Sequence, residues 1–189
     1  MHATKFIVVI FLFSQLVVAQ DRKKEIKPAE TKMEIFASKT GTITKFVDFK
    51  MPSLKLFLGE VAETRVRKVI VGNELKYFYL IEKESKSAHT TASIEYSDLL
   101  EVIKALATLK SEAPGDQSSK PDYLENKFVT SDGFQLGYYV TEGKGKWYIK
   151  FDRYGSDNTV FINDVQTIET SLNAARNKIE EMNHQAITR

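Results

Sequence analysis

Two stretches of the chain, 70 residues apart, share one pattern of apolar and polar side chains. The first runs from Lys76 to Lys83 and the second from Lys146 to Arg153. Each begins and ends with a basic residue, has an acidic residue just before the last one, and is mostly aromatic or aliphatic between. Successive side chains of a strand point to opposite faces, so Trp147, Ile149 and Phe151 share one face. The pattern therefore predicts an equivalent β-strand in each of two similar units.

A helix with the same apolar register is predicted after each of these strands. Apolar residues recur at steps of three and four over residues 98–110 and again from 164 to about 184, which places them on one helical face. Short apolar strands precede both helices, and Ser97-Asp98 and Asn163-Asp164 stand where N-caps are expected. The offset of 66 residues is constant for four pairs: Leu99 and Val165, Val102 and Ile168, Leu106 and Leu172, Leu109 and Ala175.

The fold class that follows is α+β, a duplicated βββα unit whose antiparallel strands carry two helices on one face. One continuous sheet and two smaller sheets are both compatible with the pattern. The first unit spans 33–110 and includes an extra hairpin, with Glu34–Ser38 as one strand and Thr42–Phe49 as the other. Residues 51–60 have no clear assignment. A proline- and glycine-containing linker is predicted at 111–125, and the second unit spans 126–189.

The first residues have the pattern of a secretory signal peptide. Phe6 to Phe13 is an unbroken apolar run, and Val17 and Ala19 suit positions −3 and −1 of a cleavage site before Gln20. An uncleaved membrane anchor is the alternative, but the run is short for a bilayer. Residues 20–32 are charged, which predicts a flexible lead-in. We therefore expect a secreted or periplasmic protein with no membrane span after cleavage.

Composition excludes several kinds of chemistry. The chain has no cysteine, so disulfides, thiolate metal sites and cysteine nucleophiles are ruled out. The net charge is +2 with both signs interspersed, which argues against nucleic acid as a partner. Beyond the predicted signal peptide the only histidines are His89 and His184, which lack the spacing of a zinc site. We expect no metal and no cofactor.

A hydrolase that uses carboxylates is the alternative function. Glu142, Asp152 and Asp157 are the acidic residues that would have to meet in one pocket, because acid–base hydrolysis needs paired carboxylates. Their ordinary roles are a turn, a surface strand position and a loop. The many tyrosines, Tyr139 among them, could form a platform for glycans or peptides, although aromatic residues in strands are more often core.

The leading hypothesis is an exported, non-catalytic module that binds a protein, a peptide or an envelope component. The strand from Lys76 to Lys83 carries Phe78 and Leu80 on the face opposite its core residues, where polar side chains are usual. Tyr148 is on the corresponding face of the second strand. Either Leu54–Leu58 of the same chain or a partner protein should cover the apolar face. Phe78, Leu80 and Tyr148 are therefore the candidate binding residues.

Overall fold

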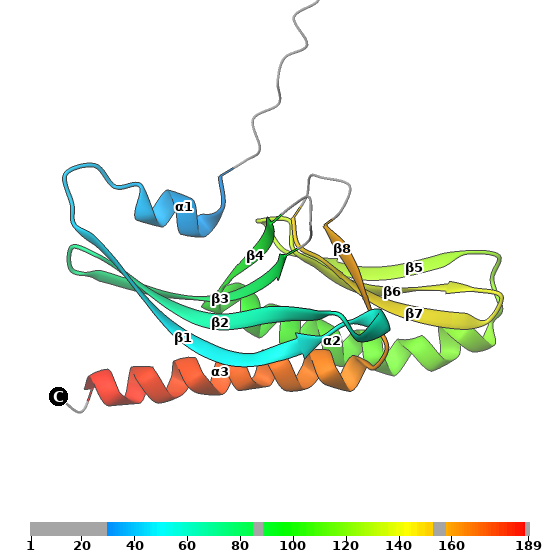
Figure 1. Ribbon diagram of the computed structural model, residues 1–189. Helices are drawn as coiled ribbons and strands as arrows, with labels where there is room; N and C mark the ends of the chain where they lie inside the picture. Colours follow the sequence, from blue (N-terminus) through cyan, green and yellow to red (C-terminus); the bar gives the residue numbers. More distant parts are fainter. Residues whose placement is uncertain (1–29, 85–88, 153–157, 188–189) are drawn as a thin grey trace, which may run out of the picture.

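The computed structural model describes residues 30–84, 89–152 and 158–187, which leaves the predicted signal peptide and most of the lead-in outside it. The described chain forms two four-stranded antiparallel sheets and three α-helices (Figure 1). The α+β class and the duplication are confirmed. Each copy has four strands followed by a long helix, and the strands form two separate sheets.

The first sheet, sheet A, has the order β1-β2-β3-β4. Its strands are β1 (Thr44–Lys55), β2 (Val61–Val71), β3 (Glu74–Glu84) and β4 (His89–Glu95). Residues 51–60 are now assigned, because β1 continues through Pro52 with an irregular register between Met51 and Leu54. A proline is tolerated there because β1 is an edge strand. A short 3-10 turn, η1 (Phe57–Gly59), then leads into β2.

The second sheet, sheet B, has the order β5-β6-β7-β8. Its strands are β5 (Leu124–Val129), β6 (Gln135–Thr141), β7 (Lys144–Lys150) and β8 (Thr159–Ile162). Glu142 and Gly143 join β6 to β7 with φ of 51° and 73°, the positive values that a tight two-residue hairpin turn requires. A second turn, at Gly133, joins β5 to β6, with the Gly133 N–H donating to the Thr130 carbonyl oxygen.

The N-terminal segment corrects two predictions. Residues 32–37 form the short helix α1 (Lys32–Ala37), whereas Glu34–Ser38 was expected to be a strand and Lys32 to be flexible. Thr31 and Glu34 form a reciprocal capping box that fixes the start of the helix. This local signal, with an apolar side chain buried at Phe36, outweighs the strand-like composition.

The helix α2 (Tyr96–Ser118) is longer than predicted. Residues 111–118 were assigned to the linker because of Pro114 and its neighbours, but they are helical. Contacts with sheet B hold this part of the helix: Ala113 is buried, and the Tyr138 hydroxyl donates to Asp116 Oδ2 at 2.5 Å. The predicted cap at Asp98 is also wrong, because the helix begins two residues earlier and Asp98 instead accepts from Lys32 Nζ.

The helix α3 (Val165–Ile187) begins as predicted. The Asp164 side chain accepts from the Gln166 N–H at 2.9 Å and so caps the helix. On its predicted apolar face Ile168, Leu172 and Ala175 are buried and Val165 is partly buried, and the equivalent residues of α2 are buried too. The matching helical registers therefore correspond to matching core positions.

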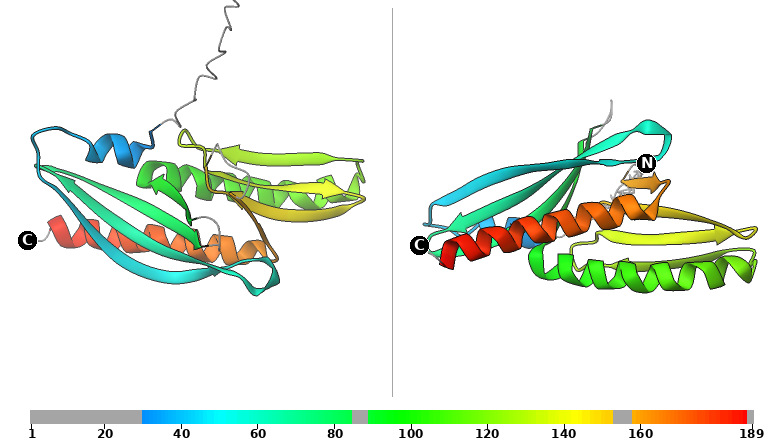
Figure 2. Two further views of the ribbon diagram at one scale, coloured as in Figure 1. Left: turned by 45° about the horizontal axis from the view of Figure 1, so that its top comes forward. Right: turned by 90° about the horizontal axis from the view of Figure 1, so that it is seen from below.

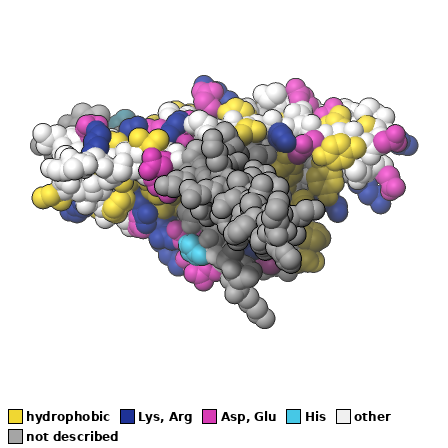
Figure 3. Space-filling view, turned by 90° about the horizontal axis from the view of Figure 1, so that it is seen from above, with side chains coloured by type: hydrophobic (Ala, Val, Ile, Leu, Met, Phe, Trp, Pro, Cys, Tyr) yellow, Lys and Arg dark blue, Asp and Glu magenta, His cyan; other side chains and the backbone are white. Residues whose placement is uncertain are grey.

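The two long helices are exchanged between the units. The helix α2 follows sheet A but makes most of its contacts with sheet B, chiefly with β6 and β5. The helix α3 follows sheet B but lies mainly against β1 and β2 of sheet A. Both helices lie on the same side of the sheets, next to each other and antiparallel (Figures 1 and 2). The opposite sides of the sheets, called here their outer faces, are seen from above in Figure 3.

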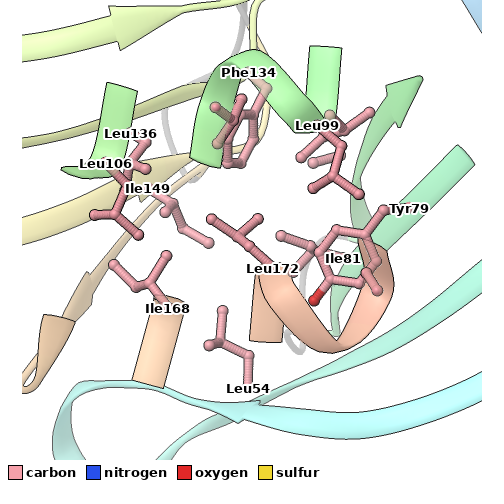
Figure 4. Close-up of a cluster of buried hydrophobic side chains, with 14 of the residues drawn as sticks. Leu54, Tyr79, Ile81, Leu99, Leu106, Phe134, Leu136, Ile149, Ile168 and Leu172 are labelled. Carbon is pink, nitrogen blue, oxygen red and sulfur yellow. The ribbon is translucent and has the colours of Figure 1, made fainter. Parts of the chain in front are cut away.

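Because of this exchange, one continuous core joins both units. Tyr79 and Ile81 of sheet A, Leu136 and Ile149 of sheet B, and Leu172 of α3 are buried in the same cluster (Figure 4). Tyr79 is fully buried, and its hydroxyl is hydrogen-bonded to Ser171 Oγ of α3 at 2.6 Å. Neither sheet has a core that is closed by its own unit alone.

Candidate binding surface

Phe78 and Leu80, two of the three candidate binding residues, are fully buried. They lie on the outer face of sheet A in a cluster with Val69 and Val71, which α1 covers through Phe36 and the partly buried Met33 and Ala37. The cover thus belongs to the same chain. It is α1 and not Leu54–Leu58, because Leu54 and Leu56 are buried in the main core. Phe78 and Leu80 therefore do not form an exposed patch.

Polar contacts to both units hold α1 in place. Lys32 Nζ lies 2.7 Å from both carboxylate oxygens of Asp98, and the Lys32 N–H donates to Asp132 Oδ2 at 3.0 Å. Asp98 belongs to the first unit and Asp132 to the second. Burial raises the pKa of Asp132, and the bond from Lys32 only partly offsets this effect. The helix α1 is therefore attached across the junction of the units.

Charged side chains occupy another part of the outer face of sheet A. Asp48 accepts from Arg67 Nε at 2.6 Å and from Arg65 Nη1 at 3.1 Å, and Arg65 also pairs with Glu82. The hydrogen bonds from Arg67 and Arg65 hold the pKa of Asp48 below its usual range. These ionic groups have their partners within the sheet, so this region offers few unpaired groups for a ligand.

The outer face of sheet B is different, because aromatic rings form a row across it. Tyr123, just before β5, stacks on Tyr139 of β6 with ring centroids 6.4 Å apart, and Tyr139 meets Phe161 of β8 edge-on at 6.1 Å. Tyr123 is 63% exposed and Phe161 is 41% exposed. In Figure 3 hydrophobic side chains gather over this sheet beside charged ones. These three residues are called here the aromatic row.

Tyr148, the third candidate residue, lies on this same face but is only 5% exposed. Its hydroxyl donates to Glu125 Oε1 at 2.6 Å. The bond from Tyr148 lowers the pKa of Glu125, and burial together with the same bond raises the pKa of Tyr148. Lys127 Nζ also bonds Glu125, at 2.9 Å. Tyr148 is therefore a fixed part of the sheet surface beside the exposed rings.

Lysines accompany the aromatic row. Lys144, Lys146 and Lys150 point to the outer face because they alternate with the core residues of β7, and Lys146 is paired directly with Tyr139 in the strand register. Within the described part of the chain, Lys144 and Lys146 make no ion pair. Glu125 is the acidic residue that lies among these strands, and Tyr148 and Lys127 already bond it. The face therefore has surplus positive charge.

A hollow of about 150 Å³ adjoins the row at the β8 side. Phe57 of η1, Lys146 and Phe161 line it together with Asn163. This volume is below the range of roughly 300–1,000 Å³ that encloses most small-molecule ligands. The hollow suits one group of a larger ligand that lies over the sheet.

The acidic residues proposed for hydrolysis are not brought together. Glu142 is in the turn before β7 and Asp152 follows its end, so the whole strand separates them. Seven residues of strand span roughly 23 Å, too far for paired carboxylates. Asp152 Oδ1 accepts from Asn158 Nδ2 at 2.6 Å, which ties the ends of the loop between β7 and β8. Asp157 lies outside the described residues.

The two histidines in the described ranges are exposed, His89 at the start of β4 and His184 near the end of α3. In the described ranges no group of three or more potential ligands could hold a metal ion. No helix in those ranges is both long and apolar enough to cross a membrane. No protein-family model matches the sequence, and no match was found to a curated protein or to a solved structure.

Sequence analysis missed most of this surface. Tyr139 was considered for a platform, but Tyr123 and Phe161 were not. Alternation alone places Tyr139, Tyr148 and Phe161 on one face once the strand register is known. The stack of Tyr123 on Tyr139 could not be found this way, because Tyr123 lies before β5 begins.

Proposed function

We propose that this protein is an exported, non-catalytic module that binds an envelope component through the outer face of sheet B. The observation that carries the proposal is the aromatic row, in which Tyr139 contacts both Tyr123 and Phe161 on a sheet face with no covering helix among the described elements. Contiguous exposed apolar groups on a soluble domain mark interaction surfaces, and aromatic residues are enriched in them.

The comparison of the two sheets supports this proposal. On sheet A the outer face carries Phe78, and α1 covers it. On sheet B the equivalent position is Tyr148, and the rings around it stay accessible. A helix inside the same chain thus removes one apolar face from water and leaves the other exposed. We infer that the exposed face is retained for a ligand.

The experiment is sedimentation of the purified protein with an envelope fraction from its own source. Phe161→Ser should lower the bound fraction, because it removes one ring of the row. Phe46→Ser is the matched control: Phe46 is also a half-exposed strand phenylalanine, 49% against 41%, but it lies on sheet A. Equal binding by the two variants, or no binding by the wild type, would contradict the proposal. Circular dichroism of each variant checks that it is folded.

Export has its own test. The proposal requires removal of residues 1–19, so the protein recovered from outside the cytoplasm should begin at Gln20. Mass spectrometry of the intact protein measures this directly. An extracellular or periplasmic protein that keeps Met1, or a protein found only in the cytoplasm, would contradict export through a cleaved signal.

A further inference from the structure

We propose that the outer face of sheet B binds an anionic polysaccharide, with sugar rings stacked on the aromatic row and sugar carboxylates paired with Lys144 and Lys146. This inference rests on the proposed function and names the ligand class of the same surface. Three features support it: the spacing of the rings, the unpaired lysines and the shape of the surface.

The rings provide more than one contact for a sugar, although they do not form one flat surface. Tyr123 and Tyr139 are nearly parallel, with 21° between their planes and centroids 6.4 Å apart, whereas Phe161 meets Tyr139 at 6.1 Å with its plane turned by 75°. A pyranose ring presents an apolar C–H face and a rim of hydroxyls, so it can cover an aromatic ring and keep its polar groups in water. The hollow beside the row, about 150 Å³, is too small to enclose most small-molecule ligands, so this surface fits an extended polymer better than a small buried molecule.

The charges favour an acidic ligand. Lys146 is paired with Tyr139 in the strand register and Lys144 with Thr141, and neither lysine has an ion-pair partner in the described chain. Glu125, the acid of this face, is neutralised in part by Lys127 at 2.9 Å. A carboxylate that approaches over Tyr139 therefore meets two free ammonium groups. Lys146 also lines the hollow beside Phe161, which can take one projecting group of the chain.

The same charges make nucleic acid a poorer fit. A single strand carries a phosphate on every nucleotide, and proteins that bind it use a continuous positive groove, often with arginine. None of the described strand residues of sheet B is an arginine, and Glu125 lies among its lysines. An anionic polysaccharide has one apolar face on each sugar ring and separated carboxylates. It therefore matches a surface of aromatic rings and lysines more closely than a nucleic acid does.

The test measures affinity for polygalacturonate, for its fully methyl-esterified form and for oligo(dT), with the full mature chain. The esterified polymer keeps the sugar rings but loses the charges. We expect polygalacturonate to bind more tightly than the ester, and its affinity to fall as salt rises from 50 to 300 mM. Equal affinity for the two polymers, no affinity for polygalacturonate, or tighter binding of oligo(dT) would overturn the inference.

Variants assign the binding to this face. Tyr139→Ala should weaken binding by about threefold to tenfold, as expected for the loss of one aromatic contact. Tyr139→Phe keeps the ring and should weaken binding less than Tyr139→Ala does. Lys146→Gln should weaken binding roughly twofold to fivefold and reduce its salt dependence, whereas Lys45→Gln, an exposed strand lysine of sheet A, should not. Equal effects of Lys146→Gln and Lys45→Gln would contradict the proposed site.

Competition separates this inference from the proposed function. If polygalacturonate displaces the protein from the envelope fraction, both stand. If the envelope fraction binds through Phe161 but polygalacturonate neither binds nor competes, the ligand class is wrong and the binding function remains. If polygalacturonate binds through Tyr139 but the envelope fraction does not bind, the ligand chemistry holds and the proposed function fails.

Discussion

The exchange of helices predicts that neither half of the chain folds alone. In the intact protein α2 covers sheet B and α3 covers β1 and β2 of sheet A. A cut after Ser119 would leave residues 30–119 with α2 but without its main sheet, and residues 120–187 with sheet B but without its main helix. We therefore expect both fragments to be unfolded when separate and to form the native structure when mixed.

The stability that the second unit loses without α2 can be estimated from the side chains that this helix helps to bury. Leu136, Tyr138 and Val140 of β6 and Ile149 of β7 have no exposed surface. Complete burial of an apolar side chain contributes roughly 1.5–3 kcal/mol, so these four together contribute about 6–12 kcal/mol, an upper estimate. A whole domain is stable by only about 5–15 kcal/mol. The loss of α2 is therefore enough to unfold the second unit.

A helix could in principle fold back onto its own sheet, but the connections oppose this. No residue separates β4 from α2, and only two separate β8 from α3. Connections between strands and helices usually have about two to six residues, so the connection before α2 is shorter than usual and the connection before α3 is at the short end of the range. The short connections therefore favour helices that continue past their own sheets to the other sheet, most clearly for α2.

The assay uses near-ultraviolet circular dichroism and urea unfolding of fragments 30–119 and 120–187, alone and mixed in equal amounts. Trp147, packed against Tyr138 with centroids 4.9 Å apart, gives a signal for native packing in the second fragment. The separate fragments should lack this signal, and the mixture should recover it. A monomeric fragment that unfolds cooperatively with an intact near-ultraviolet spectrum would refute the reasoning.

Three other predictions concern stability, each measured by urea unfolding. Tyr79→Phe should lower the free energy of unfolding by about 1 kcal/mol, because it removes a buried hydrogen bond to Ser171. Tyr77→Phe should not lower it, since no described partner bonds the Tyr77 hydroxyl. An equal loss of stability in the two variants would refute this prediction. Phe36→Ala should either lower the free energy of unfolding by about 3 kcal/mol or release α1 and increase the binding of a hydrophobic dye. If neither stability nor dye binding changes, α1 does not cover the outer face of sheet A. Asp48 has a lowered pKa, so its bond to Arg67 stabilises the fold at neutral pH, and this contribution is lost as the pH falls through that pKa. In Asp48→Asn the free energy of unfolding should therefore fall by roughly 0.5 kcal/mol less between neutral and acidic pH than in the wild type. An equal fall in both proteins would contradict this prediction.

Periodicity found the elements whose signal is local and repeated. Leu99 and Val165 begin the matching helical faces, and Tyr79 and Ile149 are core residues of matching strands, as the alternation predicted. These predictions succeeded because a helix of period 3.6 and a strand of period two each need one apolar face to be buried.

The failures have identifiable causes. Pro114 suggested a linker, but contacts of Ala113 and Asp116 with sheet B keep that segment helical. The composition around Phe36 suggested a strand, yet the capping box at Thr31 starts a helix there. In both cases distant or neighbouring contacts outweighed intrinsic propensity.

The amino-acid sequence by itself determined that the chain is α+β, that it is built from two equivalent units, and which faces of the helices and of the matching strands turn toward the core. It determined these because hydrophobic periodicity is a property of neighbouring residues. Tertiary structure alone decided that the strands form two sheets, that α2 and α3 exchange sheets, and that α1 covers Phe78 while Tyr123 and Phe161 stay exposed. An apolar face must be buried, but its pattern does not specify which element of the folded chain will cover it.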